Sequence, residues 1–150
     1  MSLTEAIDLL LVEDSPHDAE LVVRAMRRSR PSVRIGVVRD GVEALDYVFG
    51  EGTHAQRGTV ELPRLILLDL KLPRIDGLEV LRRLKSDPVT QRIFVVMLTS
   101  SREPRDIEET YRLGVNSYVV KPVSYERLMM AVQEIGSYWL ALNQGLGAET

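Results

Sequence analysis

Five polar side chains in this sequence have the chemistry of a phosphoryl-transfer site. They are Glu13, Asp14, Asp69, Thr99 and Lys121. Three carboxylates in one cleft favour a hard cation, and Mg²⁺ held by carboxylates, waters and phosphate oxygens fits best. One carboxylate can act as the nucleophile toward a phosphoryl donor. Mg²⁺ and Lys121 would neutralise charge on the transferred group, and Thr99 could donate a hydrogen bond to it.

These side chains belong together only if the fold brings them to one place. Each follows a short apolar run, and we predict strands over 7–12, 33–38, 65–68, 93–98 and 117–120. Helical patterns follow the strands, over 17–30, 41–49, 78–85, about 104–113 and about 124–142. This alternation predicts an α/β fold with a doubly wound, five-stranded parallel sheet covered by helices on both faces. The carboxyl ends of its strands share one edge, where ligands bind.

Composition limits the class of protein. The chain has 150 residues, and 19 basic against 22 acidic side chains give a formal charge of −3. It has no Cys and two His, which excludes disulfides, thiolate metal sites and a Cys nucleophile. The charge balance argues against a nucleic-acid binder. No apolar run reaches the ~18 residues of a membrane span, and the first residues have no basic signal-peptide region, so we expect a cytoplasmic protein.

Four motifs stand at the ends of the predicted strands: LLLVEDS (9–15), LILLDLKLPRIDG (65–77), VVMLTSS (95–101) and YVVKP (118–122). Together they resemble the response-regulator receiver domain of two-component signalling, over almost the whole chain. The resemblance implies a flavodoxin-like (βα)5 fold and a phosphoacceptor switch with a sensor histidine kinase as partner. We expect one receiver domain over 1–150, with its core at about 5–142, a long surface loop at about 50–63 and a short tail. The chain is most similar to single-domain regulators that partner bacterial and cyanobacterial phytochromes, so a bacteriophytochrome is a candidate kinase.

The resemblance also implies a role for each matched acid. Asp69 would be the phosphoacceptor and would contact Mg²⁺. Asp14 would bind Mg²⁺ directly, and Glu13 would help through a water molecule. The backbone carbonyl of Lys71 would be a further ligand.

The remaining matched residues would read out phosphorylation. Thr99 would bond the phosphoryl group and Lys121 would pair with it. Tyr118 matches the switch aromatic, which turns inward when Thr99 moves. Pro122 would follow a cis peptide bond. Lys71 and Ser101 occupy positions that tune the rate of dephosphorylation in the family.

Other functions use the same residue types. A haloacid-dehalogenase-like phosphatase needs an acid two residues after its nucleophile, where this chain has Lys71. We therefore expect a switch that assists its own phosphorylation and dephosphorylation, and not an enzyme acting on other substrates. A binding module with vestigial acids would lack one of the key residues, and none is replaced. Taken singly, Asp14 could be a helix cap, Asp69 a turn residue and Lys121 a loop lysine.

The last predicted helix has more apolar residues than one buried face needs. Its predicted core stripe is Leu128, Val132, Ile135, Trp139 and Leu142. The apolar residues left over are Tyr125, Met129, Met130, Tyr138 and Leu140. We predict a homodimer through the face formed by 104–113, 117–120 and 124–142; the alternative is a wider buried face. Only eight residues follow Leu142, so we expect output by protein contact and no DNA binding. The arginines at 24, 27, 28 and 30 are predicted to be a solvated helix face.

Overall fold

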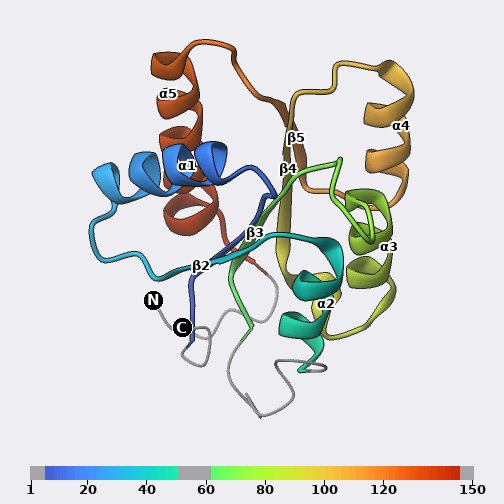
Figure 1. The fold of residues 1–150 in the computed structure, drawn as a ribbon. Coiled ribbons are helices and arrows are strands. Elements are labelled where there is room, and N and C mark those ends of the chain that lie inside the picture. The colour runs from blue at the N-terminus through green and yellow to red at the C-terminus, as the bar shows by residue number, and fades with distance from the viewer. Residues whose placement is uncertain (1–5, 51–61, 146–150) are drawn as a thin grey trace.

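The computed structural model describes residues 6–50 and 62–145, and its centre is a five-stranded parallel sheet (Figure 1). The strand order is β2-β1-β3-β4-β5. The strands are β1 (Leu9–Val12), β2 (Ile35–Val38), β3 (Leu65–Leu68), β4 (Phe94–Thr99) and β5 (Ser117–Val120). The direction of strand addition reverses between β1 and β3, so these two neighbours flank the point where ligands bind in such sheets.

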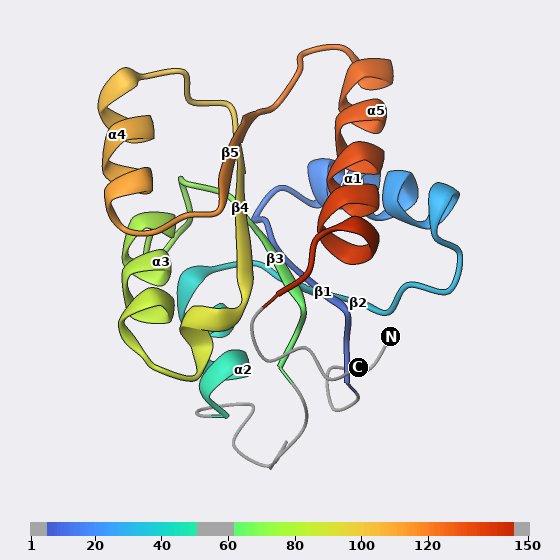
Figure 2. The same cartoon turned by 180° about the vertical axis from the view of Figure 1, so that it is seen from behind.

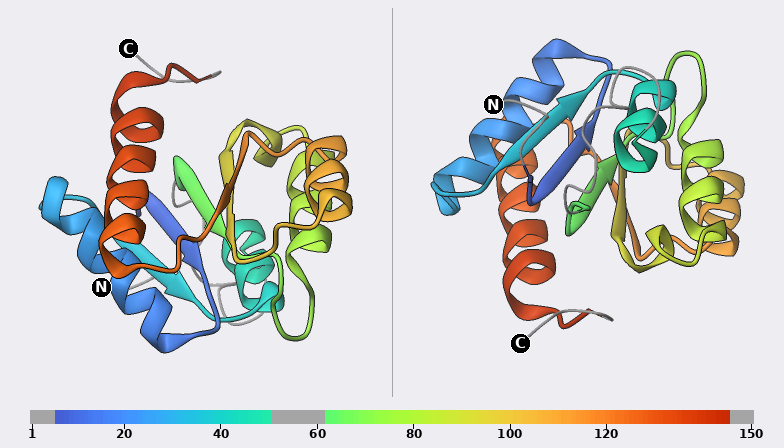
Figure 3. Two further views of the ribbon diagram at one scale, coloured as in Figure 1. Left: turned by 90° about the horizontal axis from the view of Figure 1, so that it is seen from above. Right: turned by 90° about the horizontal axis from the view of Figure 1, so that it is seen from below.

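Five α-helices cover the two faces of the sheet. They are α1 (Pro16–Ser29), α2 (Gly41–Phe49), α3 (Gly77–Ser86), α4 (Pro104–Arg112) and α5 (Tyr125–Gly136). Helices α1 and α5 pack together on one face, and α2, α3 and α4 lie on the other (Figures 1 and 2). The views along the vertical axis show the sheet between these two layers (Figure 3). Within the described ranges, no helix has the length and apolar character needed to cross a membrane.

Local sequence explains where these elements begin. The central strands LLLV and LILL are buried along their whole length, as expected of parallel strands covered on both faces. Four helices begin after a side chain that accepts a hydrogen bond from the first turn, which satisfies an otherwise unpaired backbone amide. These caps are Ser15, Asp40, Asp76 and Ser124.

The structure confirms the predicted α/β fold, the five strands and the five helices. Most of the expected loop at 50–63 lies outside the described residues, because 51–61 are not described. One element was missed, a 3-10 turn at Thr90–Arg92. Asp87 accepts hydrogen bonds from the amides of Val89 and Thr90, and the Thr90 hydroxyl donates to the Leu84 carbonyl at 2.6 Å.

The chain is helical over the predicted range of about 124–142, but it is not an α-helix throughout. The α-helix ends at Gly136, and Ser137–Leu142 continues as a wider π-helix. Two arginines bond to this segment: Arg30 donates to the carbonyl of Gly136, and Arg64 donates to that of Leu140. These arginines come directly after α1 and directly before β3. The sulfur of Met26 also packs against Gly136, at 2.6 Å from where a Cβ would stand.

The apolar residues that this segment buries differ in part from those predicted. Leu128, Val132 and Ile135 are in the core as predicted, but Leu142 is 72% exposed. Met129 and Leu140, expected on the leftover patch, are buried instead. The exposed apolar residues of this segment are therefore fewer than the sequence predicted. They are Tyr125, Met130, Tyr138 and Leu142.

Candidate functional site

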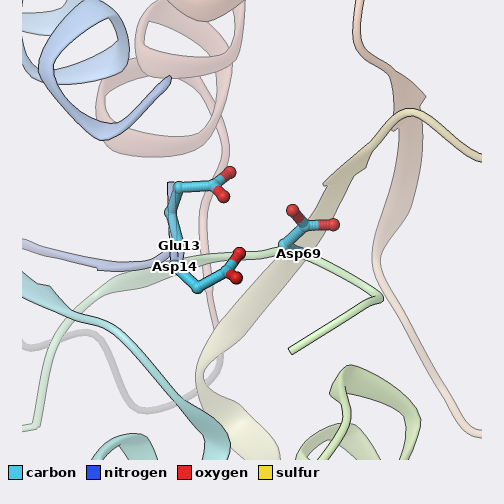
Figure 4. A group of neighbouring side chains, drawn as sticks. All are labelled: Glu13, Asp14 and Asp69. Carbon is cyan, nitrogen blue, oxygen red and sulfur yellow. The ribbon is translucent and has the colours of Figure 1, made fainter. Parts of the chain in front are cut away.

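The carboxylates singled out in the sequence meet at the carboxyl ends of β1 and β3. Glu13 and Asp14 follow β1, and Asp69 follows β3; Figure 4 shows their side chains gathered above these strand ends. One oxygen from each carboxylate can be chosen so that all three lie within 4.8 Å of one another. Oxygens on opposite sides of a bound Mg²⁺ are about 4 Å apart, so this donor set fits a hard divalent ion with small adjustments.

Lys121 follows β5 and reaches across the strand ends to these acids. Its Nζ lies 2.6 Å from Oε1 of Glu13 and 3.2 Å from Oδ2 of Asp69. A third carboxylate, Asp18, lies 3.1 Å from the same nitrogen. The side chains of Lys121 and Glu13 are 8% and 4% exposed, so their ion pair is screened little by water.

Burial and charge shift the pKa values of this pair. Burial raises the pKa of Glu13, and the negative charge of Asp69 raises it too, while the hydrogen bond from Lys121 acts in the opposite direction. Burial alone would lower the pKa of Lys121, but its bonds to Glu13 and Asp18 and the charge of Asp69 raise it overall. Lys121 is therefore a permanent cation beside Asp69.

An open cleft of about 460 Å³ lies over these residues. Its lining includes all the polar side chains from which the sequence analysis began, together with Lys71, Ser101 and Asp18. Acidic residues outnumber basic ones in the lining, with five against three: Glu13, Asp14, Asp18, Asp69 and Glu103 against Lys71, Arg102 and Lys121. This surplus of negative charge favours a bound cation.

Thr99 and Tyr118 are connected through Ser101. The buried Thr99 lines the cleft, and its hydroxyl oxygen accepts a hydrogen bond from the Ser101 amide at 3.4 Å. The Tyr118 hydroxyl donates to the Ser101 carbonyl at 3.0 Å, and the partly buried Tyr118 ring packs against the core. Burial raises the pKa of Tyr118, and the hydrogen bond to Ser101 opposes this. Tyr118 does not line the cleft, but one residue separates it from Thr99 in this network.

The loop between β3 and α3 shapes the other side of the cleft. The Lys71 amide donates to Oδ1 of Asp69 at 3.4 Å, so this loop contacts the carboxylate directly. The Gly77 amide donates to the Leu70 carbonyl at 2.8 Å, which brings the start of α3 onto the end of β3. A Cβ on Gly77 would stand 2.2 Å from the Asp69 carbonyl oxygen, so only glycine allows this approach.

The predicted cis peptide bond before Pro122 was wrong. No cis bond occurs within 6–50 or 62–145, so the bond between Lys121 and Pro122 is trans. The trans form is favoured by about 0.5–1 kcal/mol before proline. With that bond trans, the Lys121 amide reaches the Thr99 carbonyl at 2.7 Å and its ammonium reaches Glu13, so these contacts do not require the cis form.

Asp18 is the site residue that the sequence analysis missed. In the sequence it is an acidic residue in the first turn of a helix, where Asp is common because it favours the positive end of the helix dipole. Its place in the first turn of α1, four residues after Asp14, was the one signal in the sequence, and it does not by itself connect Asp18 with Lys121.

Comparisons with known proteins agree with this geometry. A family model described as the response regulator receiver domain matches residues 9–133. The chain is 44% identical over 140 residues to the probable methanogenesis regulatory protein FilR2 of Methanothrix harundinacea (strain 6Ac), covering 93% of this chain and 87% of that protein.

Two further relatives are response regulators. Over 132 residues the chain is 39% identical to Rcp1 of Synechocystis sp. (88% of each chain), whose Mn²⁺-bound crystal structure superposes with a TM-score of 0.84. A structure of the phosphorylated cyanobacterial phytochrome response regulator RcpA superposes with a TM-score of 0.87 at 39% identity, covering 95% of this chain and 99% of that one. The chain therefore belongs to the response regulator receiver domain family, the signalling switches of two-component systems.

Proposed function

We propose that Asp69 accepts a phosphoryl group from the phosphohistidine of a sensor histidine kinase. The observation that carries this proposal is the Lys121 ammonium, which lies 3.2 Å from the Asp69 carboxylate in a cleft also lined by Asp14 and Thr99. A nucleophile, a fixed positive charge and a hydroxyl donor are the groups that phosphoryl transfer to a carboxylate needs.

The transfer is a single displacement at phosphorus. An oxygen of the Asp69 carboxylate forms a bond to phosphorus as the bond between phosphorus and the imidazole nitrogen breaks. The electron pair of that bond stays on the imidazole nitrogen, which takes a proton from solvent. Lys121 holds the carboxylate in place and balances charge on the transferred group, while the Thr99 hydroxyl donates to one of its oxygens.

Mg²⁺ is the ion that we propose for the carboxylate cluster. Glu13, Asp14, Asp69 and the Lys71 carbonyl would hold it, and all four residues line the cleft. Bound there, it would neutralise negative charge on the phosphoryl group. The crystal structure of Mn²⁺-bound Rcp1 supports a divalent-metal site in a relative, and hard oxygen ligands favour Mg²⁺.

The phosphorylated state would end by hydrolysis. Water would form a bond to phosphorus, the bond to Asp69 would break, and phosphate would leave with the Asp69 carboxylate restored. We propose that the chain assists this reaction with the same Lys121 and Thr99, and that Lys71 and Ser101, which line the cleft, tune its rate. Lys71 stands where a haloacid-dehalogenase-like phosphatase has its carboxylic acid, so the residue type favours a switch over an efficient phosphatase.

A bacteriophytochrome-type kinase is our proposed donor, because RcpA is by its name a phytochrome response regulator. The contact would take place in the cytoplasm, where such kinases obtain ATP. Transfer would favour the state in which Thr99 bonds the phosphoryl group and Tyr118 lies inward, through their shared contact with Ser101.

Asp69→Asn is the direct test of the acceptor. We expect it to abolish phosphorylation by acetyl phosphate and Mg²⁺, because the amide is no nucleophile, while the far-ultraviolet circular dichroism stays that of the wild type. Phosphate-affinity electrophoresis separates the two forms. Asp76→Asn is the matched control, since Asp76 caps α3 outside the cleft, and it should be phosphorylated like the wild type. Unchanged labelling of Asp69→Asn would refute the assignment.

We also propose that the output is a protein contact and not DNA binding, through a homodimer formed by the α4, β5 and α5 face. Its support is a set of exposed apolar side chains on or beside these elements, at residues 111, 123, 125 and 130. Val123, which is 99% exposed, stands between β5 and α5. The net charge of −3 supports a protein partner over DNA.

Sedimentation velocity tests the dimer. We expect a dimer that weakens when Tyr111 is replaced by Glu, because a charge would be buried in the interface. Val37→Glu, on the β2 side of the sheet, is the matched control and should leave the sedimentation coefficient unchanged. A monomer both with and without the phosphoryl analogue beryllofluoride would contradict the proposal.

A further inference from the structure

Asp18 contacts Lys121 across 103 residues of sequence, with 3.1 Å between Oδ2 and Nζ. We propose that Asp18 is a positioning residue for phosphoryl transfer: with Glu13, it holds the Lys121 ammonium so that one N–H points at Asp69. The proposal rests on the proposed function of Asp69 as phosphoacceptor and extends it to a residue on α1.

The hydrogen-bond capacity of the ammonium is the first argument. A lysine ammonium has three N–H donors. Three carboxylates take them, Glu13 at 2.6 Å, Asp18 at 3.1 Å and Asp69 at 3.2 Å. Two of the three donors are therefore held by residues of the β1–α1 segment, and the third is directed to Asp69. When Asp69 carries a phosphoryl group, this third donor is the one available to the phosphoryl oxygens.

The rigidity of the β1–α1 turn is the second argument. Oε2 of Glu13 accepts a hydrogen bond from the Ser15 amide at 3.1 Å, and the Ser15 hydroxyl accepts one from the Asp18 amide at 3.2 Å. Glu13 and Asp18 are thus connected through the cap of α1. The cap holds the backbone of Asp18 close to Glu13, so both carboxylates can reach Lys121 from one side and direct its third N–H toward Asp69.

Side-chain flexibility explains why a second anchor matters. Lysine has a long side chain with high rotamer entropy, and its ammonium can turn among several partners. Glu13 alone would fix the distance of the ammonium from β1 but not its direction. Asp18 supplies a second point on the α1 side, and its side chain is 34% exposed at the mouth of the cleft.

The negative charge of Asp18 would have the opposite effect, because it would repel the phosphoryl group. The two effects predict different series of variants. If Asp18 acts by positioning the Lys121 ammonium, Asp18→Asn should be phosphorylated like the wild type, since its amide oxygen can accept the same hydrogen bond. If charge repulsion dominates, Asp18→Asn and Asp18→Ala should both be phosphorylated faster than the wild type.

We would measure phosphorylation by acetyl phosphate with Mg²⁺, and binding of beryllofluoride by calorimetry, for the wild type, Asp18→Ala and Asp18→Asn. We expect Asp18→Ala to be phosphorylated about tenfold more slowly and to bind beryllofluoride about tenfold more weakly, because misplacing a charged group at a reacting centre costs up to about a hundredfold and Glu13 still anchors the ammonium. Asp18→Asn should stay within about twofold of the wild type. Glu20→Ala, which removes an exposed acid of the same helix paired with Arg24, is the matched control and should change neither value.

A second measurement follows Lys121 without any phosphoryl donor. The ¹⁵N-detected ammonium resonance of a buried, fully bonded lysine should be sharp in the wild type and Asp18→Asn and broadened in Asp18→Ala. A wild-type rate and a sharp resonance in Asp18→Ala would overturn the proposal, as would faster phosphorylation of both variants. If the wild type is not phosphorylated at all, the proposed function of Asp69 is refuted, and this inference with it. If the wild type is phosphorylated and Asp18→Ala gives a wild-type rate and a sharp resonance, only this inference is refuted.

Discussion

Replacing Lys121 with Met is expected to slow phosphorylation of Asp69 by about 10²–10³-fold and to lower the free energy of unfolding by about 3–5 kcal/mol. The rate falls because one fixed charge that stabilises the transferred group is lost. Stability falls because the nearly buried carboxylates of Glu13 and Asp69 lose their common cation, and breaking a buried ion pair from one side leaves uncompensated charge. Urea unfolding without metal and acetyl phosphate kinetics measure the two effects.

Arg24→Ala is the matched control for that variant. It also removes a cation from an ion pair, at 2.7 Å from Glu20, but both side chains are more than half exposed. Exposed pairs contribute about 0–1 kcal/mol, so the variant should unfold like the wild type. An equal loss of stability in the two variants would contradict the importance of burial at Lys121.

The loss caused by Lys121→Met should depend on pH. Burial raises the pKa of Glu13 above its ordinary value, and Asp14, Asp18 and Asp69 surround it with negative charge once the ammonium is gone. At a pH below the ordinary pKa of Glu13, its carboxyl group is neutral in both the folded and the unfolded chain, so folding buries no charge there. As the pH rises from about 4 to 7, the unfolded chain ionises first, so the stability gap to the wild type should widen. A gap of the same size at pH 4.5 and 7.5 would contradict this account.

Gly77→Ala is expected to lower the free energy of unfolding by about 2–4 kcal/mol and to slow phosphorylation as well. The added Cβ would stand 2.2 Å from the Asp69 carbonyl oxygen and 2.8 Å from Cα of Leu70. Both neighbours are backbone atoms, so the start of α3 and the end of β3 must move apart, and overpacking of this kind is destabilising. Because Asp69 itself is displaced, chemical denaturation and acetyl phosphate labelling should both report the change.

Gly50→Ala separates this steric effect from backbone strain. Gly50 ends α2 in the left-handed region with φ of 66°, and nothing lies within 4 Å of where its Cβ would stand. Alanine there costs about 1 kcal/mol of conformational strain and leaves the site untouched. If Gly50→Ala slowed phosphorylation as much as Gly77→Ala, contact with Asp69 would not be the cause.

The sequence predicted the sheet and the central part of the site for the same reason. Apolar strands followed by polar residues place those residues at one edge of any parallel sheet, so Asp14, Asp69 and Lys121 could be brought together without coordinates. Asp18 could not be identified in this way, because its neighbours in sequence make it an ordinary first-turn acid of α1. Only the direction in which Lys121 extends from β5 shows that Asp18 belongs to the site.

Two other differences concern backbone conformation. The helix over 124–142 has good helical periodicity, which does not show that it widens after Gly136, where Arg30 and Arg64 bond its carbonyls. These arginines are far away in the chain, so the local sequence could not identify their contacts. The peptide bond before Pro122 has the trans form that is ordinarily favoured before proline.

The two arginine bonds at the end of α5 have a mechanical consequence. The helix starts four residues after Lys121, runs for about 18 Å, and is fastened near its far end, at Gly136 by Arg30 and at Leu140, beyond it, by Arg64. A shift of Lys121 would therefore rotate α5 about its fastened C-terminal end. The displacement would be largest at Tyr125 and would decrease toward Leu140, so a downstream protein that responds to this motion would be expected to bind the first turn of the helix.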